Sequence, residues 1–176
     1  ADLVLAMHLR PDAFTDEQKA RNFAYYEGIT VRDSSLSAAT QAVLAAEIGH
    51  LELAYDYLAE SALVDIQNRQ GNTASGLHLA ALAGGWSALV AGFGGFRARD
   101  GIVSFAPRLP EDVARLVFHL VYRGRCLRVS ATAGEATYRV LSGDPLEIRH
   151  HGEPVLIGAE PVSRPTWDRR RASFRR

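Results

Sequence analysis

The spacing of apolar residues changes near residue 95, and this change divides the chain into two kinds of structure. Before it, apolar residues recur at intervals of three and four, which is the period of an α-helix. After it, they alternate every second residue in short runs bounded by turn residues, which indicates antiparallel strands. We therefore predict a helical region over residues 1–95, a β-sandwich over 96–160 and a flexible, arginine-rich tail over 161–176.

Capping residues predict where the helices begin. Thr15 is an expected N-cap, and Gln18 stands at the position that completes a capping box with it. Asp33 or Ser35 is expected to cap the next helix, and the last helix is predicted to run from Leu77 to about Phe93. The strands are predicted around Ile102–Phe105, Leu116–Tyr122, Leu127–Ala131, Tyr138–Val140 and Leu146–Ile148.

Composition narrows the classes of partner. The formal net charge of the 176 residues is zero, which argues against binding to nucleic acid or to a membrane by bulk charge. No apolar run reaches the roughly 18 residues that span a bilayer. Cys126 is the single cysteine, so the chain has no intrachain disulfide and suits a reducing compartment. We expect a cytoplasmic protein with no nucleic-acid or membrane partner.

The segment from Asn72 to Arg97 holds the first candidate for chemistry. A polar loop ends at Gly76 and leads into an apolar helix, with His78 expected in the first helical turn. Unpaired backbone N–H groups at a helix start attract anions, and a histidine there can donate to a phosphate or a sugar hydroxyl. The alternative is a histidine that is hydrogen-bonded within a helix–helix contact.

Two further candidates lie between the first helices. The hydroxyl-rich segment Thr30–Ser37 contains Arg32 and leads into a helix, so it is either a second anion cradle or an ordinary N-cap with solvated serines. Glu27 follows Tyr25 and Tyr26, and a carboxylate beside aromatic rings is suited to hold sugar hydroxyls. Glu27 is equally consistent with a helix-end glutamate that faces water.

No catalytic pair of carboxylates and no metal site are predicted. Adjacent strand residues point to opposite faces, so His150 and His151 are not expected to share an ion. The acidic residues of the middle helices have spacings that suit a solvated face, and they are Glu47, Glu52, Asp56, Glu60 and Asp65.

Several motifs in order resemble the C-terminal part of glycoside hydrolase family 65, which contains maltose, trehalose, kojibiose and nigerose phosphorylases and some hydrolases. The resemblance covers roughly residues 1–158. The segments that carry it are Tyr25–Glu27, Thr30–Ser37, Asn72–Thr73, Gly76–Ala80, Ala83–Trp86, Gly92–Gly95, Phe105–Pro110 and Pro145–Gly152.

The resemblance implies an α+β chain: the last helices of an (α/α)6 barrel followed by a small antiparallel β-sandwich. It implies an inverting reaction, in which a glutamic acid on an earlier barrel helix protonates the glycosidic oxygen and inorganic phosphate attacks the anomeric carbon. The general acid, and a Lys-Gln pair that holds substrate, are expected upstream of Ala1. This chain is therefore expected to be a fragment that contributes phosphate- and sugar-contacting loops and is inactive alone.

The resemblance also assigns site residues. It implies phosphate binding by Ser34, Ser35, Gly76 and His78, and sugar binding by Glu27. Many members of the family have histidine where this chain has arginine at position 32. A guanidinium binds phosphate well, so phosphorolysis remains compatible with this difference.

The expected partners are a disaccharide and inorganic phosphate, with phosphate acting as co-substrate and no other cofactor or metal. A homodimer of the full-length enzyme is also considered. Two hypotheses from other functional classes remain open. The first is a free-standing module that binds sugar or an anion without catalysis, and the second is an interaction domain whose arginine-rich tail meets an acidic partner.

Overall fold

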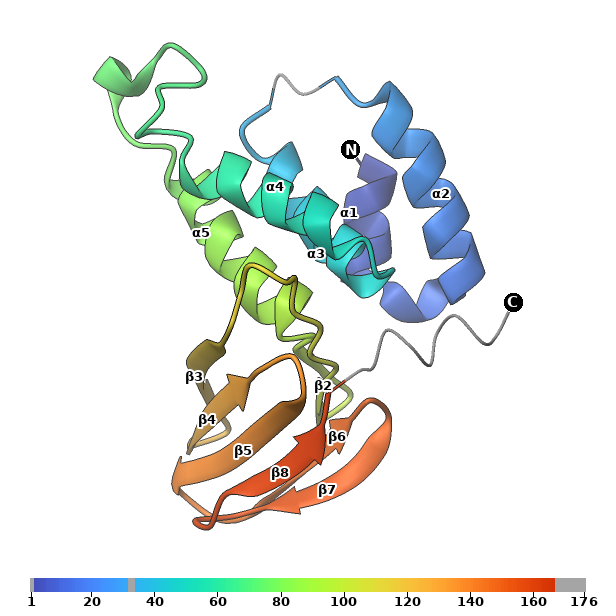
Figure 1. The fold of residues 1–176 in the computed structure, drawn as a ribbon, viewed down its shortest axis with the longest axis vertical. Coiled ribbons are helices and arrows are strands. Elements are labelled where there is room, and N and C mark those ends of the chain that lie inside the picture. Colours follow the sequence, from blue (N-terminus) through green and yellow to red (C-terminus); the bar gives the residue numbers. More distant parts are fainter. Residues whose placement is uncertain (1, 32–33, 167–176) are drawn as a thin grey trace. The chain divides into compact units, whose positions relative to one another are not determined.

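The computed structural model describes residues 2–31 and 34–166. The chain divides between Gly92 and Phe93 into two compact units. Helices form the first unit and strands form the second, as the blue-to-green and yellow-to-red segments of Figure 1 show. The predicted order of helices followed by sheets is confirmed. In the part of the chain that the structure describes, no helix has the length and apolar character needed to cross a bilayer.

The capping box predicted for the second helix is present. Thr15 Oγ1 accepts a hydrogen bond from the Gln18 backbone N–H at 3.2 Å, and the Thr15 backbone N–H donates to Gln18 Oε1 at 2.8 Å. The helical elements of the first unit, ending with a π-helical segment, are α1 (Asp2–Leu9), η1 (Pro11–Ala13), α2 (Asp16–Ile29), α3 (Ser37–Glu47), α4 (Leu51–Ala62), η2 (Thr73–Ser75), α5 (Leu79–Ser87) and η3 (Ala88–Phe93).

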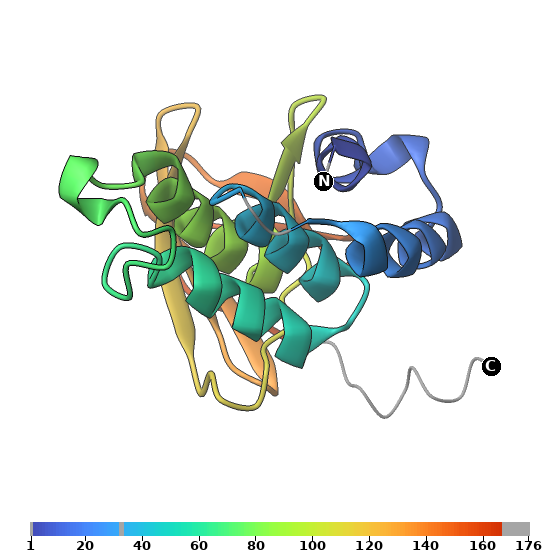
Figure 2. The ribbon, with the colours of Figure 1, turned by 90° about the horizontal axis from the view of Figure 1, so that it is seen from above.

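Helix α3 forms the centre of the first unit, and α1, α4 and α5 pack against it. Its alanine-rich surface lets the neighbouring backbones come close. A Cβ at Gly84 would lie 2.5 Å from the Ala39 Cβ, and a Cβ at Gly92 would lie 3.3 Å from the Val43 Cα. Figure 2 shows α3, α4 and α5 side by side. Small residues therefore fix the distance between α5 and α3.

Two predicted helix starts are wrong. Leu36 occupies the N-cap position of α3 without a side-chain cap, so Ser35 is not the cap, and Asp33 lies outside the described residues. The Ser34 hydroxyl instead accepts the Leu36 N–H at 3.3 Å and forms a turn ahead of the helix. Helix α5 begins at Leu79, two residues later than predicted, because His78 is held by a side chain from another segment.

In the described residues, the second unit contains two four-stranded sheets (Figure 1). One has the strand order β1-β2-β6-β7 and the other has the order β3-β4-β5-β8. The strands are β1 (Arg97–Arg99), β2 (Ile102–Phe105), β3 (Leu116–Tyr122), β4 (Arg125–Ala131), β5 (Glu135–Ser142), β6 (Leu146–His150), β7 (Glu153–Ile157) and β8 (Val162–Pro165).

Alternation of side chains builds the core of this unit. Phe105 of β2 and Tyr138 of β5 come from different sheets, and their rings lie 5.2 Å apart between centroids. Both are fully buried. The β3–β4 hairpin turns at Arg123 and Gly124, which both have positive φ, as a tight two-residue hairpin turn requires.

The strand prediction needs three corrections. The sandwich is not antiparallel throughout, because β2 and β6 pair in parallel. Strands β1 and β7 were not predicted. The expected tail contains β8, whose residues Val162–Pro165 pair with β5, so the chain from residue 161 begins with packed structure. Residues 167–176 of that tail lie outside the described residues.

Candidate functional site

One carboxylate holds His78 at two points. Asp65 Oδ1 lies 2.6 Å from His78 Nδ1, and Asp65 Oδ2 accepts the His78 backbone N–H at 3.0 Å. The Asp65 side chain is 8% exposed and the His78 side chain is 17% exposed. The hydrogen bond from the His78 side chain holds the pKa of Asp65 below its usual value. The carboxylate is therefore ionised near neutral pH and accepts both hydrogen bonds.

In the loop that precedes His78, several backbone N–H groups donate hydrogen bonds to acceptors in the same loop. Asn68 Oδ1 accepts from both the Thr73 N–H and the Thr73 hydroxyl, at 3.1 and 2.7 Å. The Ser75 N–H donates to Asn72 O and the Gly76 N–H donates to Thr73 O. The expectation of unpaired amides in this loop is wrong at these positions, because the loop folds into a turn of 3-10 helix.

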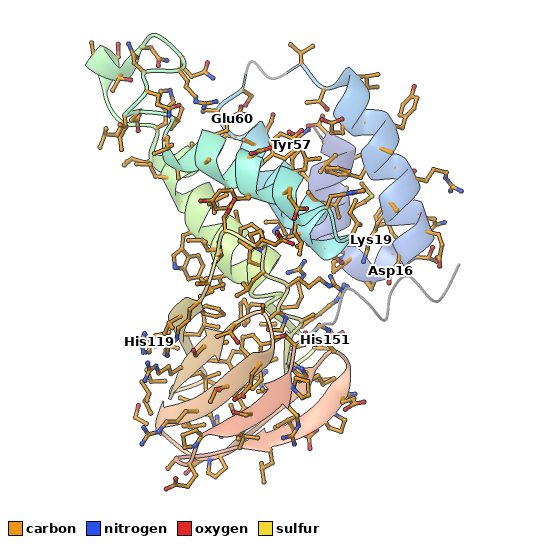
Figure 3. All side chains as sticks on the ribbon, in the orientation of Figure 1. Asp16, Lys19, Tyr57, Glu60, His119 and His151 are labelled. Atoms are coloured by element: carbon orange, nitrogen blue, oxygen red, sulfur yellow. The ribbon has the colours of Figure 1, made fainter. Side chains whose placement is uncertain are left out.

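Glu27, near the end of α2, receives a hydrogen bond from a buried tyrosine. The Tyr57 hydroxyl, on α4, donates to Glu27 Oε1 at 2.9 Å, and the Tyr57 side chain is 1% exposed. Figure 3 labels Tyr57 on its helix. Tyr25 and Tyr26, the aromatic neighbours noticed in the sequence, contact each other edge to face. Glu27 is half-buried and is thus not a fully solvated helix-end glutamate.

The serines before α3 lie at the surface. Ser34 is exposed and Ser35 is half-buried, and both come just ahead of the first turn of the helix. Arg32 lies outside the described residues. It stands at the position where many members of the family that the sequence resembles have histidine.

Helix contacts place the candidate loops at one end of the first unit. Ser61, at the end of α4, donates to Ala81 O, near the start of α5, at 2.7 Å. Gly84 of α5 meets Ala39, the third residue of α3. The N-terminal ends of α3 and α5 therefore lie beside the C-terminal end of α4. Among the described residues, no hydrogen bond joins His78 to the serines or to Glu27.

Two acidic residues expected on a solvated face are structural partners instead. Asp65 holds His78, and Glu47 Oε1 accepts from Lys19 Nζ at 2.7 Å. The Lys19 side chain is 6% exposed, and its Nζ also lies 3.7 Å from Asp16 Oδ1. Because Lys19 is on α2 and Glu47 is on α3, their ion pair joins the two helices (Figure 3). Sequence reasoning missed these pairs because their members lie 13 and 28 positions apart.

His150 and His151 contact each other, so the premise that they point to opposite faces of one strand does not hold. Their rings lie 4.6 Å apart, edge to face, because His151 lies beyond the end of β6 with a φ of +47°. His150 Nδ1 lies 2.7 Å from the Tyr138 hydroxyl, and its Nε2 lies 2.8 Å from Pro165 O. Both ring nitrogens are therefore used within the sandwich. Among the described residues, no cluster of three or more His, Cys, Asp or Glu side chains is arranged to hold a metal.

Two family models match the chain, one over the helical part and one over the strands. Residues 1–87 match the glycosyl hydrolase family 65 central catalytic domain, and residues 96–157 match the glycosyl hydrolase family 65 C-terminal domain. The chain belongs to glycoside hydrolase family 65.

Relatives in the family include enzymes named as phosphorylases. The chain is 53% identical over 165 residues to an uncharacterized glycosyl hydrolase of Mycobacterium leprae, which covers 93% of this chain and 21% of that protein. It is 39% identical to an alpha,alpha-trehalose phosphorylase of Thermoanaerobacter brockii, over 89% of this chain and 20% of the relative. It is 36% identical to a maltose phosphorylase of Bacillus subtilis, over 89% and 21%. The chain thus spans about a fifth of the length of the curated relatives it matches.

A solved structure shares the fold. A protein described as a putative kojibiose phosphorylase from human microbiome superimposes with a TM-score of 0.87 over 94% of this chain and 23% of that protein. The sequence identity is 23%, so this likeness concerns the fold.

Proposed function

We propose that this chain is the C-terminal part of an inverting disaccharide phosphorylase or hydrolase. Its helices would complete an (α/α)6 barrel, and its loops would meet phosphate and sugar. The names of the relatives, which include trehalose, maltose and kojibiose phosphorylases, support the substrate class. The observation that carries the proposal is the fixed imidazole of His78 at the end of the unit where the serine loop also lies.

We propose that Ser34, Ser35, Gly76 and His78 contact inorganic phosphate and that Glu27 contacts the sugar. A phosphate oxygen would form a bond to the anomeric carbon while the glycosidic bond breaks. The leaving oxygen would take a proton from a carboxylic acid, which inverting enzymes of this kind require. That acid is supplied from outside this chain, so the chain alone is inactive. If phosphate is replaced by water as the nucleophile, the same arrangement gives hydrolysis.

Exposed apolar side chains support the barrel proposal. Leu79 is 73% exposed and Trp86 is 54% exposed, although both lie on an otherwise apolar helix. Apolar helix faces are normally covered by other protein. Further large apolar side chains are exposed on the first unit at Leu9, Ile29 and Ile66. The remaining helices of the barrel would cover such faces.

The proposal includes phosphate as co-substrate with no other cofactor, a disaccharide as substrate, and the cytoplasm as the site of action. A homodimer of the full-length enzyme stays part of the expectation.

Product analysis of the full-length protein tests the proposal. Maltose, trehalose, kojibiose and nigerose would each be supplied with and without inorganic phosphate. A phosphorylase gives a sugar 1-phosphate of inverted configuration only when phosphate is present, whereas a hydrolase gives free sugars in both cases. Tight binding of phosphate or sugar with no turnover would contradict the enzyme and favour a binding module.

The site assignment is tested separately. His78→Ala should raise the KM for phosphate about tenfold or more, since a hydrogen bond to a charged group is lost. His119→Ala, on the exposed face of β3, is the matched control and should leave this KM unchanged (Figure 3). An unchanged KM in the His78 variant would remove His78 from the phosphate site.

A further inference from the structure

We propose that Asp65 is a positioning residue that fixes the tautomer of His78, so that Nε2 is the ring nitrogen presented to phosphate. This inference rests on the proposed function, because it concerns the same site. Asp65 was not predicted from the sequence to take part in the site, and it reaches His78 from a turn 13 residues earlier in the chain.

The geometry fixes both the position and the proton of the imidazole. One carboxylate oxygen accepts from the His78 backbone N–H, and the other lies 2.6 Å from Nδ1. An ionised carboxylate only accepts hydrogen bonds, so Nδ1 carries the proton of that contact. Because both oxygens act on the same residue, the ring cannot rotate to exchange its nitrogens without breaking a short hydrogen bond. The low exposure of the Asp65 side chain limits its replacement by water.

The second ring nitrogen is available to a ligand. Within the part of the chain that the structure describes, His78 Nε2 makes no hydrogen bond. With the Nδ1 proton directed to Asp65, a neutral ring accepts a hydrogen bond at Nε2 from a protonated phosphate oxygen. A charged ring donates from Nε2 to an unprotonated phosphate oxygen. Both contacts depend on the ring orientation that Asp65 holds, and the contact of the neutral ring depends in addition on the proton being on Nδ1. A histidine is commonly set in this way by the partner of its other nitrogen.

Replacement of the Asp65 carboxylate by an amide leads to a definite prediction. In Asp65→Asn, the amide oxygen can accept either from the His78 backbone N–H or from Nδ1–H, but its NH2 group must then face the other position. The backbone N–H always donates, so the amide oxygen is expected to stay there and the NH2 group to face Nδ1. Nδ1 then becomes an acceptor and the neutral ring carries its proton on Nε2. The variant keeps the shape of the site and reverses the tautomer.

The test uses the full-length protein labelled with 15N-histidine. The 15N signals of the His78 ring are assigned as those missing from the His78→Ala variant. In the unsubstituted protein, the chemical shifts of neutral His78 should report a proton on Nδ1. In Asp65→Asn they should report a proton on Nε2, and the KM for phosphate should rise about 10- to 100-fold with a smaller change in kcat. Asp56→Asn, an exposed position on α4, is the control and should change neither quantity. Asp65→Glu, which restores a carboxylate, should recover part of the phosphate affinity.

The outcomes separate this inference from the proposed function. If His78→Ala weakens phosphate binding but Asp65→Asn leaves both the tautomer and the KM unchanged, the inference is wrong and the phosphate site stands. If neither variant affects phosphate, the phosphate site itself is wrong and the inference falls with it. If Asp65→Asn does not fold, the shifts of the unsubstituted protein decide, because a neutral His78 with its proton on Nε2 overturns the inference.

Discussion

A substitution at Tyr57 tests the role of Glu27 by removing a single oxygen atom. Tyr57→Phe keeps the buried ring and removes only the hydroxyl that donates to Glu27. We expect the free energy of unfolding to fall by about 1 kcal/mol, the usual net value of such a hydrogen bond. If Glu27 contacts the sugar, the KM for disaccharide should also rise. Denaturant titration and initial rates of the full-length protein measure the two effects.

Tyr55 on the same helix provides the control for that prediction. It is half-buried, and Tyr55→Phe removes a hydroxyl that does not bond to Glu27. Equal changes in the two variants would mean that the hydrogen bond to Glu27 has no special role.

At the residue scale, the sequence predicted what depends on near neighbours. The Thr15–Gln18 capping box needs only a spacing of three residues, and it is present. The partners of Glu27 and His78 were not predictable, because Tyr57 and Asp65 come from segments brought close only by helix packing. Nothing in the spacing of Asp65 distinguished it from the other acidic residues around α4.

Substitution by alanine should change the free energy of unfolding differently at two adjacent glycines of α5. A Cβ at Gly84 would lie 2.5 Å from the Ala39 Cβ, whereas a Cβ at Gly85 would meet Ala62 at an ordinary 3.8 Å. Gly84→Ala should lower the free energy of unfolding by about 1–3 kcal/mol because α3 and α5 must move apart. Gly85→Ala should be neutral or stabilising by up to about 1 kcal/mol, since alanine favours a helix.

Thermal or denaturant unfolding of both glycine variants measures the difference. A destabilised Gly85→Ala beside an unaffected Gly84→Ala would contradict the close approach of α3 and α5.

The hairpin of β6 and β7 should lose stability in mild acid. Burial, with the charges of His150 and Arg108 nearby, lowers the pKa of His151 from its ordinary value near 6.5 to about 4. Above pH 6.5 the histidine is neutral in both folded and unfolded chains, so it has no effect. As the pH falls from 6.5 to 4, only the unfolded state gains the proton, and stability is lost over that window. The loss should reach about 3 kcal/mol by pH 4.

Amide hydrogen exchange in β6 and β7 as a function of pH tests this prediction. His151→Asn removes the titrating group, and asparagine tolerates the positive φ of this position. The variant should show a flatter pH dependence, while His119→Asn, at an exposed position, should match the unsubstituted protein. An unchanged profile in His151→Asn would assign the effect to another group.

At the scale of elements, period and turn residues were sufficient where an element is long and regular. Strands β3 and β4 were predicted because apolar residues alternate along both, and the structure joins them by a turn at Arg123 and Gly124. Strands β1, β7 and β8 were missed, because β1 has only three residues and because a proline within β7 and within β8 argues against a strand. The parallel pairing of β2 with β6 joins segments more than 40 residues apart, and only the assembled sandwich decides it.

At the scale of the whole molecule, we predict that this chain alone associates with itself. Its first unit exposes large apolar side chains, among them Leu79 and Trp86. Such surface favours aggregation when nothing covers it. Light scattering should detect particles larger than a monomer, and a dye specific for exposed apolar surface should bind. The full-length protein serves as the control, and a clean monomer without dye binding would contradict the barrel proposal.

The sequence by itself determined that helices precede strands, the Thr15–Gln18 capping box and the family, because these depend on spacing along the chain and on short motifs. Only the tertiary structure decided that Asp65 holds His78, that Tyr57 holds Glu27, and that β8 joins the second sheet. Those contacts join residues that are distant in the chain, and their energies depend on burial and on geometries of a few ångströms. Such quantities exist only after the helices and sheets have packed.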